Sequence, residues 1–210
     1  MSEPKTVATT IEEIIPGVWH WSILDDRIGG YQSDAYAVKQ AGGVVMIDPL
    51  PLAPDALAGL GKIDAICLTA ACHQRASWRY RKAFGVKVYA PADCRAMADT
   101  PDISYRAGDK LPGALEPVHT PGPESAHHGF LRHGEPTIFF CADLLVHGKE
   151  DGLRVIAGPM HDDPETSLKS VHGFLDLDFD VLCLSHGEPI FEDPKTAIEA
   201  ALENFESRQT

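Results

Sequence analysis

Residues 63–75 read IDAICLTAACHQR, an apolar run that passes directly into small and polar residues. A compact apolar run such as 63–68 predicts a strand that is buried in a sheet. The side chains from Cys72 to Arg75 therefore follow the point where this strand ends. In layered α/β folds, ligand sites collect at the carboxyl ends of strands. The stretch thus predicts a buried strand with a candidate site beside it.

Three more segments show the same arrangement of an apolar run followed by polar residues. They are HTPGPE at 119–124, CAD at 141–143 and SHGE at 185–188. Strand ends that carry His, Asp, Glu and Cys can converge on one pocket. The candidate pocket consists of Cys72, His73, Gln74, Arg75, Glu124, Asp143 and His186.

Predicted strands and helices alternate along the chain. Strands are predicted at 17–23, 35–39, 44–47, 63–68, 86–90, 114–119, 128–132, 137–146 and 181–185. Helices are predicted at 54–60, 75–84, 93–98, 164–175 and 194–205. This alternation favours an α/β or α+β fold of sheets covered by helices. No linker, repeat or low-complexity tract divides the sequence, so residues 1–210 are expected to form one domain.

Composition excludes several classes of function. The chain has 210 residues, 44% of them hydrophobic, and a net charge of −13. An acidic surface repels phosphate backbones, so nucleic acid is not an expected partner. The sequence has no apolar run of the roughly 20 residues that cross a bilayer and no basic, apolar start typical of a secretory signal. We therefore expect a cytoplasmic protein without a membrane partner.

The five cysteines argue against a disulfide framework or a zinc ribbon. They are Cys67, Cys72, Cys94, Cys141 and Cys183. Their number is odd, and none forms a C-x-x-C pair. Three of them lie inside strand-like apolar runs, where a buried structural thiol is expected.

The order of the polar segments resembles the metallo-β-lactamase superfamily, which includes hydrolases of the glyoxalase II type. Residues 33–38 and 43–49 resemble the opening strands of that family and their terminal Asp. The loop after Leu68 stands at its H-x-H-x-D-H motif, and 119–122 resembles its T-P-G-H segment. Asp143 and His186 match its G-D motif and its last histidine. The resemblance implies a four-layer αβ/βα sandwich of two mixed sheets, with the site at one edge of the sheets.

The family's zinc ligands are mostly replaced in this chain. The motif positions carry Ala70, Cys72, Gln74, Arg75 and Pro123 where the family has His, His, Asp, His and His. Ala and Pro have no ligating side chain, and Arg stays protonated and repels a cation. Zinc catalysis requires three protein ligands and one open position, and two zinc ions require more. The first expectation is therefore a divergent member that lacks two-zinc hydrolase activity and cofactors, and that binds a small molecule or a protein.

Two other interpretations remain open. One is a metal-dependent hydrolase with a rebuilt site for one zinc or other divalent ion, held by Asp143, His186 and Cys72 or Glu124. The other is a metal-free enzyme in which Cys72 is the nucleophile and a histidine is the base. For the metal-free pocket, we expect the Arg75 guanidinium to pair with Asp143 in place of a metal. One of His127 and His128 is expected to be a structural, hydrogen-bonded histidine. A homodimer also stays open, because no dimerisation patch stands out.

Overall fold

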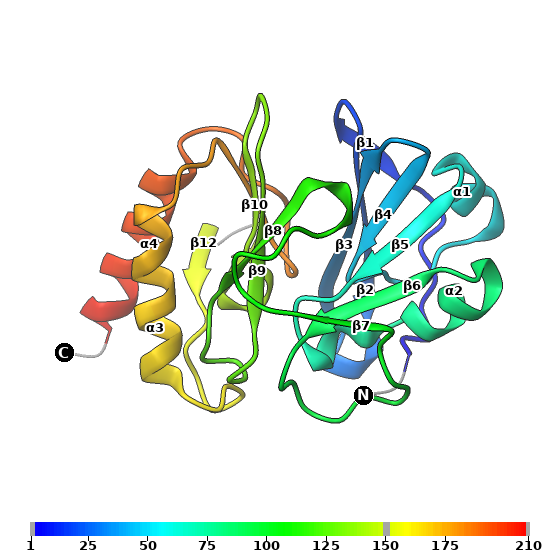
Figure 1. The fold of residues 1–210 in the computed structure, drawn as a ribbon. Helices are drawn as coiled ribbons and strands as arrows, with labels where there is room; N and C mark the ends of the chain where they lie inside the picture. The colour runs from blue at the N-terminus through cyan, green and yellow to red at the C-terminus, as the bar shows by residue number, and fades with distance from the viewer. Residues whose placement is uncertain (1–2, 149–151, 209–210) are drawn as a thin grey trace.

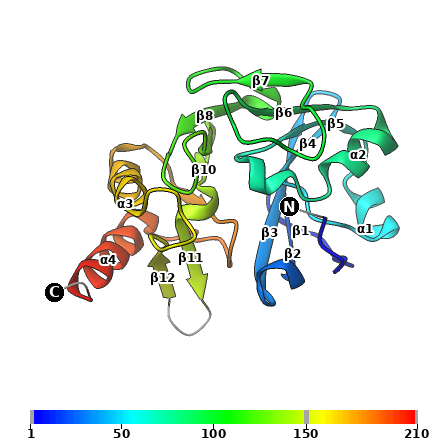
Figure 2. The same cartoon turned by 90° about the horizontal axis from the view of Figure 1, so that it is seen from below.

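The computed structural model describes residues 3–148 and 152–208 as four layers, with two facing sheets and helices on the outer side of each (Figures 1 and 2). The first sheet has the order β1 (Glu12–Ile15), β2 (Val18–Asp25), β3 (Tyr31–Gln40), β4 (Gly43–Ile47), β5 (Ile63–Cys67), β6 (Lys87–Pro91) and β7 (Ile103–Tyr105). The second has the order β13 (Val181–Cys183), β10 (Ile138–Phe140), β9 (His128–Arg132) and β8 (Leu115–His119). A separate hairpin joins β11 (Leu145–Gly148) to β12 (Gly152–Val155). Both large sheets mix parallel and antiparallel pairs, which confirms the predicted sandwich.

Alternating side chains of the strands produce three apolar layers. In β4, Val44 and Met46 pack toward the helices, whereas Val45 and Ile47 pack toward the second sheet. In β10, Phe139 faces the helices while its two neighbours face the first sheet. This is the two-residue period of a strand. Because both faces are covered, these strands are apolar throughout, as the sequence predicted.

The outer helices begin and pack as their sequences predict. The first sheet is covered by α1 (Pro54–Gly59) and α2 (Ser77–Phe84), and the second by α3 (Pro164–Gly173) and α4 (Pro194–Ser207). The Asp163 carboxylate caps α3 by accepting a hydrogen bond from the amide of Thr166. Ile198 and Leu202 of α4 are buried in the layer beneath α3 and α4. Within the described ranges, no helix is long and apolar enough to span a membrane.

Two predicted elements are wrong. The expected strand at 137–146 ends at Phe140, and a 3-10 turn, Ala142–Leu144, separates it from β11. Ala142 has a φ of 55°, which breaks the strand and turns Asp143 out of the sheet. The expected helix at 93–98 is irregular, because Asp93 has a φ of 63° and the amide of Ala98 donates to the Gln74 side chain.

The strand directions place the polar loops at one edge. β4 runs parallel to β5, and β10 runs parallel to β13, so the carboxyl ends within each pair lie together.

Gly122 in the loop after β8 lies against α3, and a Cβ there would be 2.5 Å from Ser167 Cα. Its φ of 135° is also a conformation that glycine adopts more readily than other residues. The backbone of this loop is therefore fixed against the helix.

We expect the Gly122→Ala variant to lose roughly 3 kcal/mol of unfolding free energy, because the added Cβ overlaps the helix backbone and the backbone is strained. Urea denaturation followed by circular dichroism measures the change. The matched control is Gly158→Ala, where a Cβ meets no heavy atom within 4 Å. Equal stability of the two variants would contradict the fixed contact.

Candidate functional site

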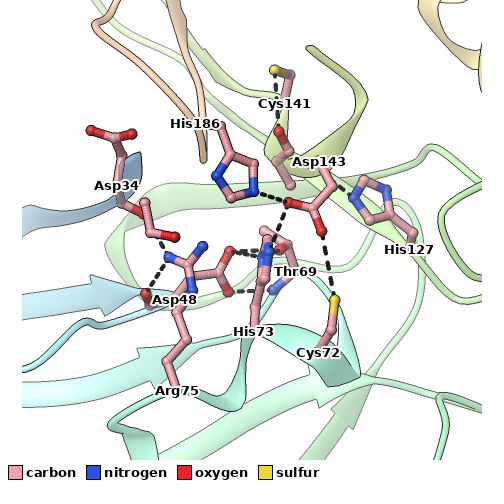
Figure 3. Close-up of polar contacts among 12 residues, drawn as sticks. Asp34, Asp48, Thr69, Cys72, His73, Arg75, His127, Cys141, Asp143 and His186 are labelled. Atoms are coloured by element: carbon pink, nitrogen blue, oxygen red, sulfur yellow. Dashed lines mark hydrogen bonds and ion pairs between the residues drawn. The ribbon is translucent and has the colours of Figure 1, made fainter. Parts of the chain in front are cut away.

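Four predicted site residues meet where the two sheets come together (Figure 3). Cys72 and His73 lie in the 3-10 turn Ala71–Gln74 that follows β5. Asp143 lies in the turn after β10, and His186 lies shortly after β13. One donor atom each from Cys72, His73 and Asp143 lies within 4.8 Å of the other two. The predicted convergence of strand ends is thus present for these residues.

His73 is held between two carboxylates. Its Nδ1 is 2.8 Å from Asp48 Oδ2, and its Nε2 is 2.8 Å from Asp143 Oδ1. Burial lowers the pKa of His73, but the charge of Asp143 and then of Asp48 outweighs it and raises the pKa to about 9. In the metal-free protein, His73 is therefore an imidazolium that donates to both carboxylates.

Asp143 receives several donors. His186 Nε2 is 3.1 Å from the same Oδ1 that His73 binds, and the Cys72 thiol donates to Oδ2 at 3.6 Å. Burial alone would raise the pKa of Asp143, but the charge of His73 and the hydrogen bonds from His186 and His73 bring it well below its usual value. Asp143 is therefore ionised at neutral pH.

The orientation of His186 is fixed from its other nitrogen. Nδ1 is 2.8 Å from the carbonyl oxygen of Gln32, which can only accept, so Nδ1 carries a proton. The next residue, Gly187, donates its amide to Asp34 at 2.6 Å. Nε2 is thus left facing Asp143, and it can donate there only when His186 is also protonated.

His127 is the structural histidine expected from the sequence. Its Nδ1 donates to the carbonyl oxygen of Thr120 at 2.7 Å, and its Nε2 accepts the amide of Asp143 at 3.3 Å. Burial lowers the pKa of His127 to about 4, so it is neutral. It positions the backbone of Asp143 and has no nitrogen left for a ligand.

Arg75 does not pair with Asp143, so this expectation is wrong. The side chain is buried, but its Nη1 donates to the backbone carbonyl oxygens of Asp34 at 2.6 Å and Asp48 at 3.1 Å. His73 occupies the expected place at Asp143 instead. The backbone of Arg75, with a φ of 36° directly after the turn, directs its side chain toward the first sheet, whereas His73 within the turn faces Asp143.

The structure brings neither Gln74 nor Glu124 into this group. Gln74 Oε1 accepts from the indole of Trp78 and the amide of Ala98, so it fastens the neighbouring loop. Glu124 is buried, and its Oε1 accepts the amide of Ala71 at 2.8 Å. It therefore supports the turn that carries Cys72.

Cys72 lacks the features of a metal-free nucleophile. Burial, followed by the charges of Asp143, Glu124 and Asp48, raises its thiol pKa well above the ordinary value. Reactive cysteines have a lowered pKa and positively charged surroundings. The geometry therefore disfavours the Cys72 nucleophile, whereas a bound cation would favour the thiolate.

Among the described residues, one group of three donors could hold a metal ion. The motif positions Ala70 and Pro123 supply no ligand, and Gln74 and Arg75 face other partners. The remaining group supplies a thiolate, an imidazole and a carboxylate, the three ligand types that zinc takes in proteins. A single ion would displace one proton from His73 and one from Cys72.

Sequence reasoning missed Asp48 and Thr69 as parts of the site. Asp48 follows β4 with a φ of 46°, and its carboxylate accepts both the amide and the hydroxyl of Thr69, at 2.8 and 2.6 Å. This fixes Asp48 toward His73. The sequence does contain a signal for Asp48, which is an acidic residue directly after a fully apolar strand. The strand that pairs with it in parallel, β5, leads into the turn that carries His73.

Comparisons with solved structures agree with this fold. The chain is similar to a metallo-beta-lactamase from Hirschia baltica (TM-score 0.68, 13% identity, 94% of this chain and 97% of that chain). It is similar to a metallo-beta-lactamase family protein from Thermus thermophilus (TM-score 0.66, 18% identity, 91% and 80%). It is also similar to the DIM-1 metallo-beta-lactamase (TM-score 0.72, 11% identity, 95% and 98%). No family model and no curated protein matches the chain.

The charged His73 makes the stability of the metal-free protein depend on pH. Its pKa rises from 6.5 in the unfolded chain to about 9 in the folded one, so its contribution is complete below pH 6.5. This contribution is lost as the pH rises through 9. Its size, a few kcal/mol of unfolding free energy, follows from the difference between the two pKa values. Urea unfolding in chelator should therefore show a steeper loss between these pH values for the wild type than for His73→Gln. His172→Gln, at an exposed histidine, is the control and should behave like the wild type.

Proposed function

Because the chain has the fold of the metallo-β-lactamase superfamily, we propose that it is a metal-dependent hydrolase that binds one divalent ion. The observation that carries this proposal is the group of Cys72, His73 and Asp143, whose donor atoms lie within 4.8 Å of one another. Three protein ligands with one open position are the usual set of a catalytic zinc site. We propose zinc, because a thiolate and an imidazole favour it over magnesium or calcium.

The hydrogen bonds behind the ligands support the proposal. Asp48 accepts from Nδ1 of His73, and the carbonyl oxygen of Gln32 accepts from Nδ1 of His186. Metal-binding histidines are usually held in this way, with the other nitrogen bonded to a carboxylate or a carbonyl. Both Nε2 atoms then converge on Asp143, so Nε2 of His73 faces the place that the ion would take.

A divalent ion in this place would polarise a carbonyl or phosphoryl group and lower the pKa of a bound water. The protein residues have separate tasks. Cys72, His73 and Asp143 would hold the ion, and Asp48 would keep His73 in the required orientation. His186, whose side chain is 19% exposed, stands at the open side beside Asp143 and can contact a substrate.

A second candidate is a metal-free binding protein, and one observation favours it. His73 already joins Asp48 and Asp143 at 2.8 Å each, so a proton can balance these charges without any ion. In that case, the pocket would serve recognition of a small molecule or a protein and not hydrolysis.

Metal analysis separates the two candidates. We expect the purified protein to bind one equivalent of Zn(II) or Co(II), and Cys72→Ser to weaken the affinity at least about tenfold, since it removes a soft ligand. The Co(II) protein should show a thiolate charge-transfer band that is absent from this variant. Cys94→Ser, at a partly exposed free thiol, is the control and should leave both readouts unchanged.

The opposite results are equally clear. Metal-free protein with the same melting temperature in chelator would support the binding protein. Two equivalents of tightly bound ion would contradict the one-ion site.

A further inference from the structure

Arg75 is a buried cation without a carboxylate partner in the described residues. The residue is 3% exposed, and a guanidinium stays protonated under all ordinary conditions. Placing a charge in the protein interior is costly unless it is paired. A buried cation that lacks such a partner therefore indicates a role beyond packing.

Only part of the guanidinium is occupied. Nη1 donates to the carbonyl oxygens of Asp34 and Asp48, while Nε is enclosed and has no hydrogen-bond partner in the described chain. Within residues 3–148 and 152–208, no hydrogen bond holds Nη2 either. Figure 3 shows this end of the side chain extending toward Asp34 and Asp48, below His186 in that view.

The carboxylates around Arg75 are engaged with other groups. The contacts are those of Asp34 with His20, Gln32 and Gly187, of Asp48 with Thr69 and His73, and of Asp143 with His73 and His186. None of these carboxylates turns toward the guanidinium. The charge of Arg75 nevertheless acts on the site. It lowers the pKa of Cys72 against the larger effects of burial and carboxylates, and it lowers the pKa of His73 against the larger effect of Asp143.

The backbone at Arg75 is also strained. Its φ of 36° and ψ of −117° lie outside the regions that residues with a Cβ normally adopt. Such strain costs on the order of 1–3 kcal/mol and persists where the surroundings enforce it, commonly at ligand sites. The strain places the side chain between the ends of β3 and β4 and the site.

We propose that Arg75 binds an oxyanion of the substrate, a carboxylate or a phosphate group, through the guanidinium donors that the protein leaves unused. Because Nε is enclosed, the contact falls to Nη2, whose charge-assisted hydrogen bond to an oxyanion is stronger than one between neutral groups. The negative charge of the substrate would then supply the partner that the buried cation lacks.

The catalytic meaning of this inference rests on the proposed hydrolase, to which it assigns an anionic substrate. The binding itself does not depend on the single ion. It can therefore be tested on protein treated with a chelator, separately from metal affinity.

Calorimetric titration with inorganic phosphate and with acetate tests the proposal in chelator-treated protein. We expect one of the two to bind, and Arg75→Met to weaken that binding at least tenfold. Arg75→Lys keeps the charge without the planar guanidinium and should fall between. Arg79→Met, at an exposed arginine paired with Glu3, is the control and should bind as the wild type does.

A second measurement needs no variant. The Arg75 Nε–H signal in the NMR spectrum should shift on titration with the anion that binds, whether or not Arg75→Met folds. Binding of phosphate would assign a phosphate ester as the substrate class, and binding of acetate would assign a carboxylate. Absence of binding, binding that Arg75→Met leaves unchanged, or an Nε–H signal that does not move would overturn the proposal. Loss of metal binding with retained anion binding would overturn only the hydrolase.

Discussion

The contact of His73 with Asp48 and Asp143 is the interaction on which the site depends. Asp48 follows a strand of the first sheet, and Asp143 follows a strand of the second. The imidazole between them, 2.8 Å from each, therefore ties the two sheets together by charged hydrogen bonds. Two carboxylates at a partly buried sheet edge require a positive group between them. Cys72 and His186 contact the same Asp143 carboxylate.

The same requirement explains how the pocket is balanced without histidines at positions 70, 72, 75 and 123. The positive charge is now supplied from the turn itself, by His73, while the cation at Arg75 rests on backbone carbonyl oxygens of the first sheet. His127 is neutral and keeps the backbone of Asp143 in place. Charge balance and backbone support are thus provided by different residues, so one can change without the other.

The sequence predicted the layers well because their cause is local. Compact runs rich in apolar residues, such as 44–47 and 63–67, favour strands covered on both faces, and Asp163 marks a helix start directly. It also predicted that Cys72, Asp143 and His186 would meet. It did not predict the partner of Asp143, because nothing local distinguishes the reach of His73 from that of Arg75. Nor did it predict the turn at Ala142, since alanine has no preference for a positive φ.

The alternation of strand side chains between apolar layers has a consequence for evolution. Substitutions inside the strands disturb these layers, and the residues directly beyond three strand ends, Leu68, Cys141 and Leu184, are buried in the same layers. Only the polar residues of the loops that follow are free of this constraint. A lineage can lose or rewrite its reaction while its scaffold persists with little detectable kinship in sequence.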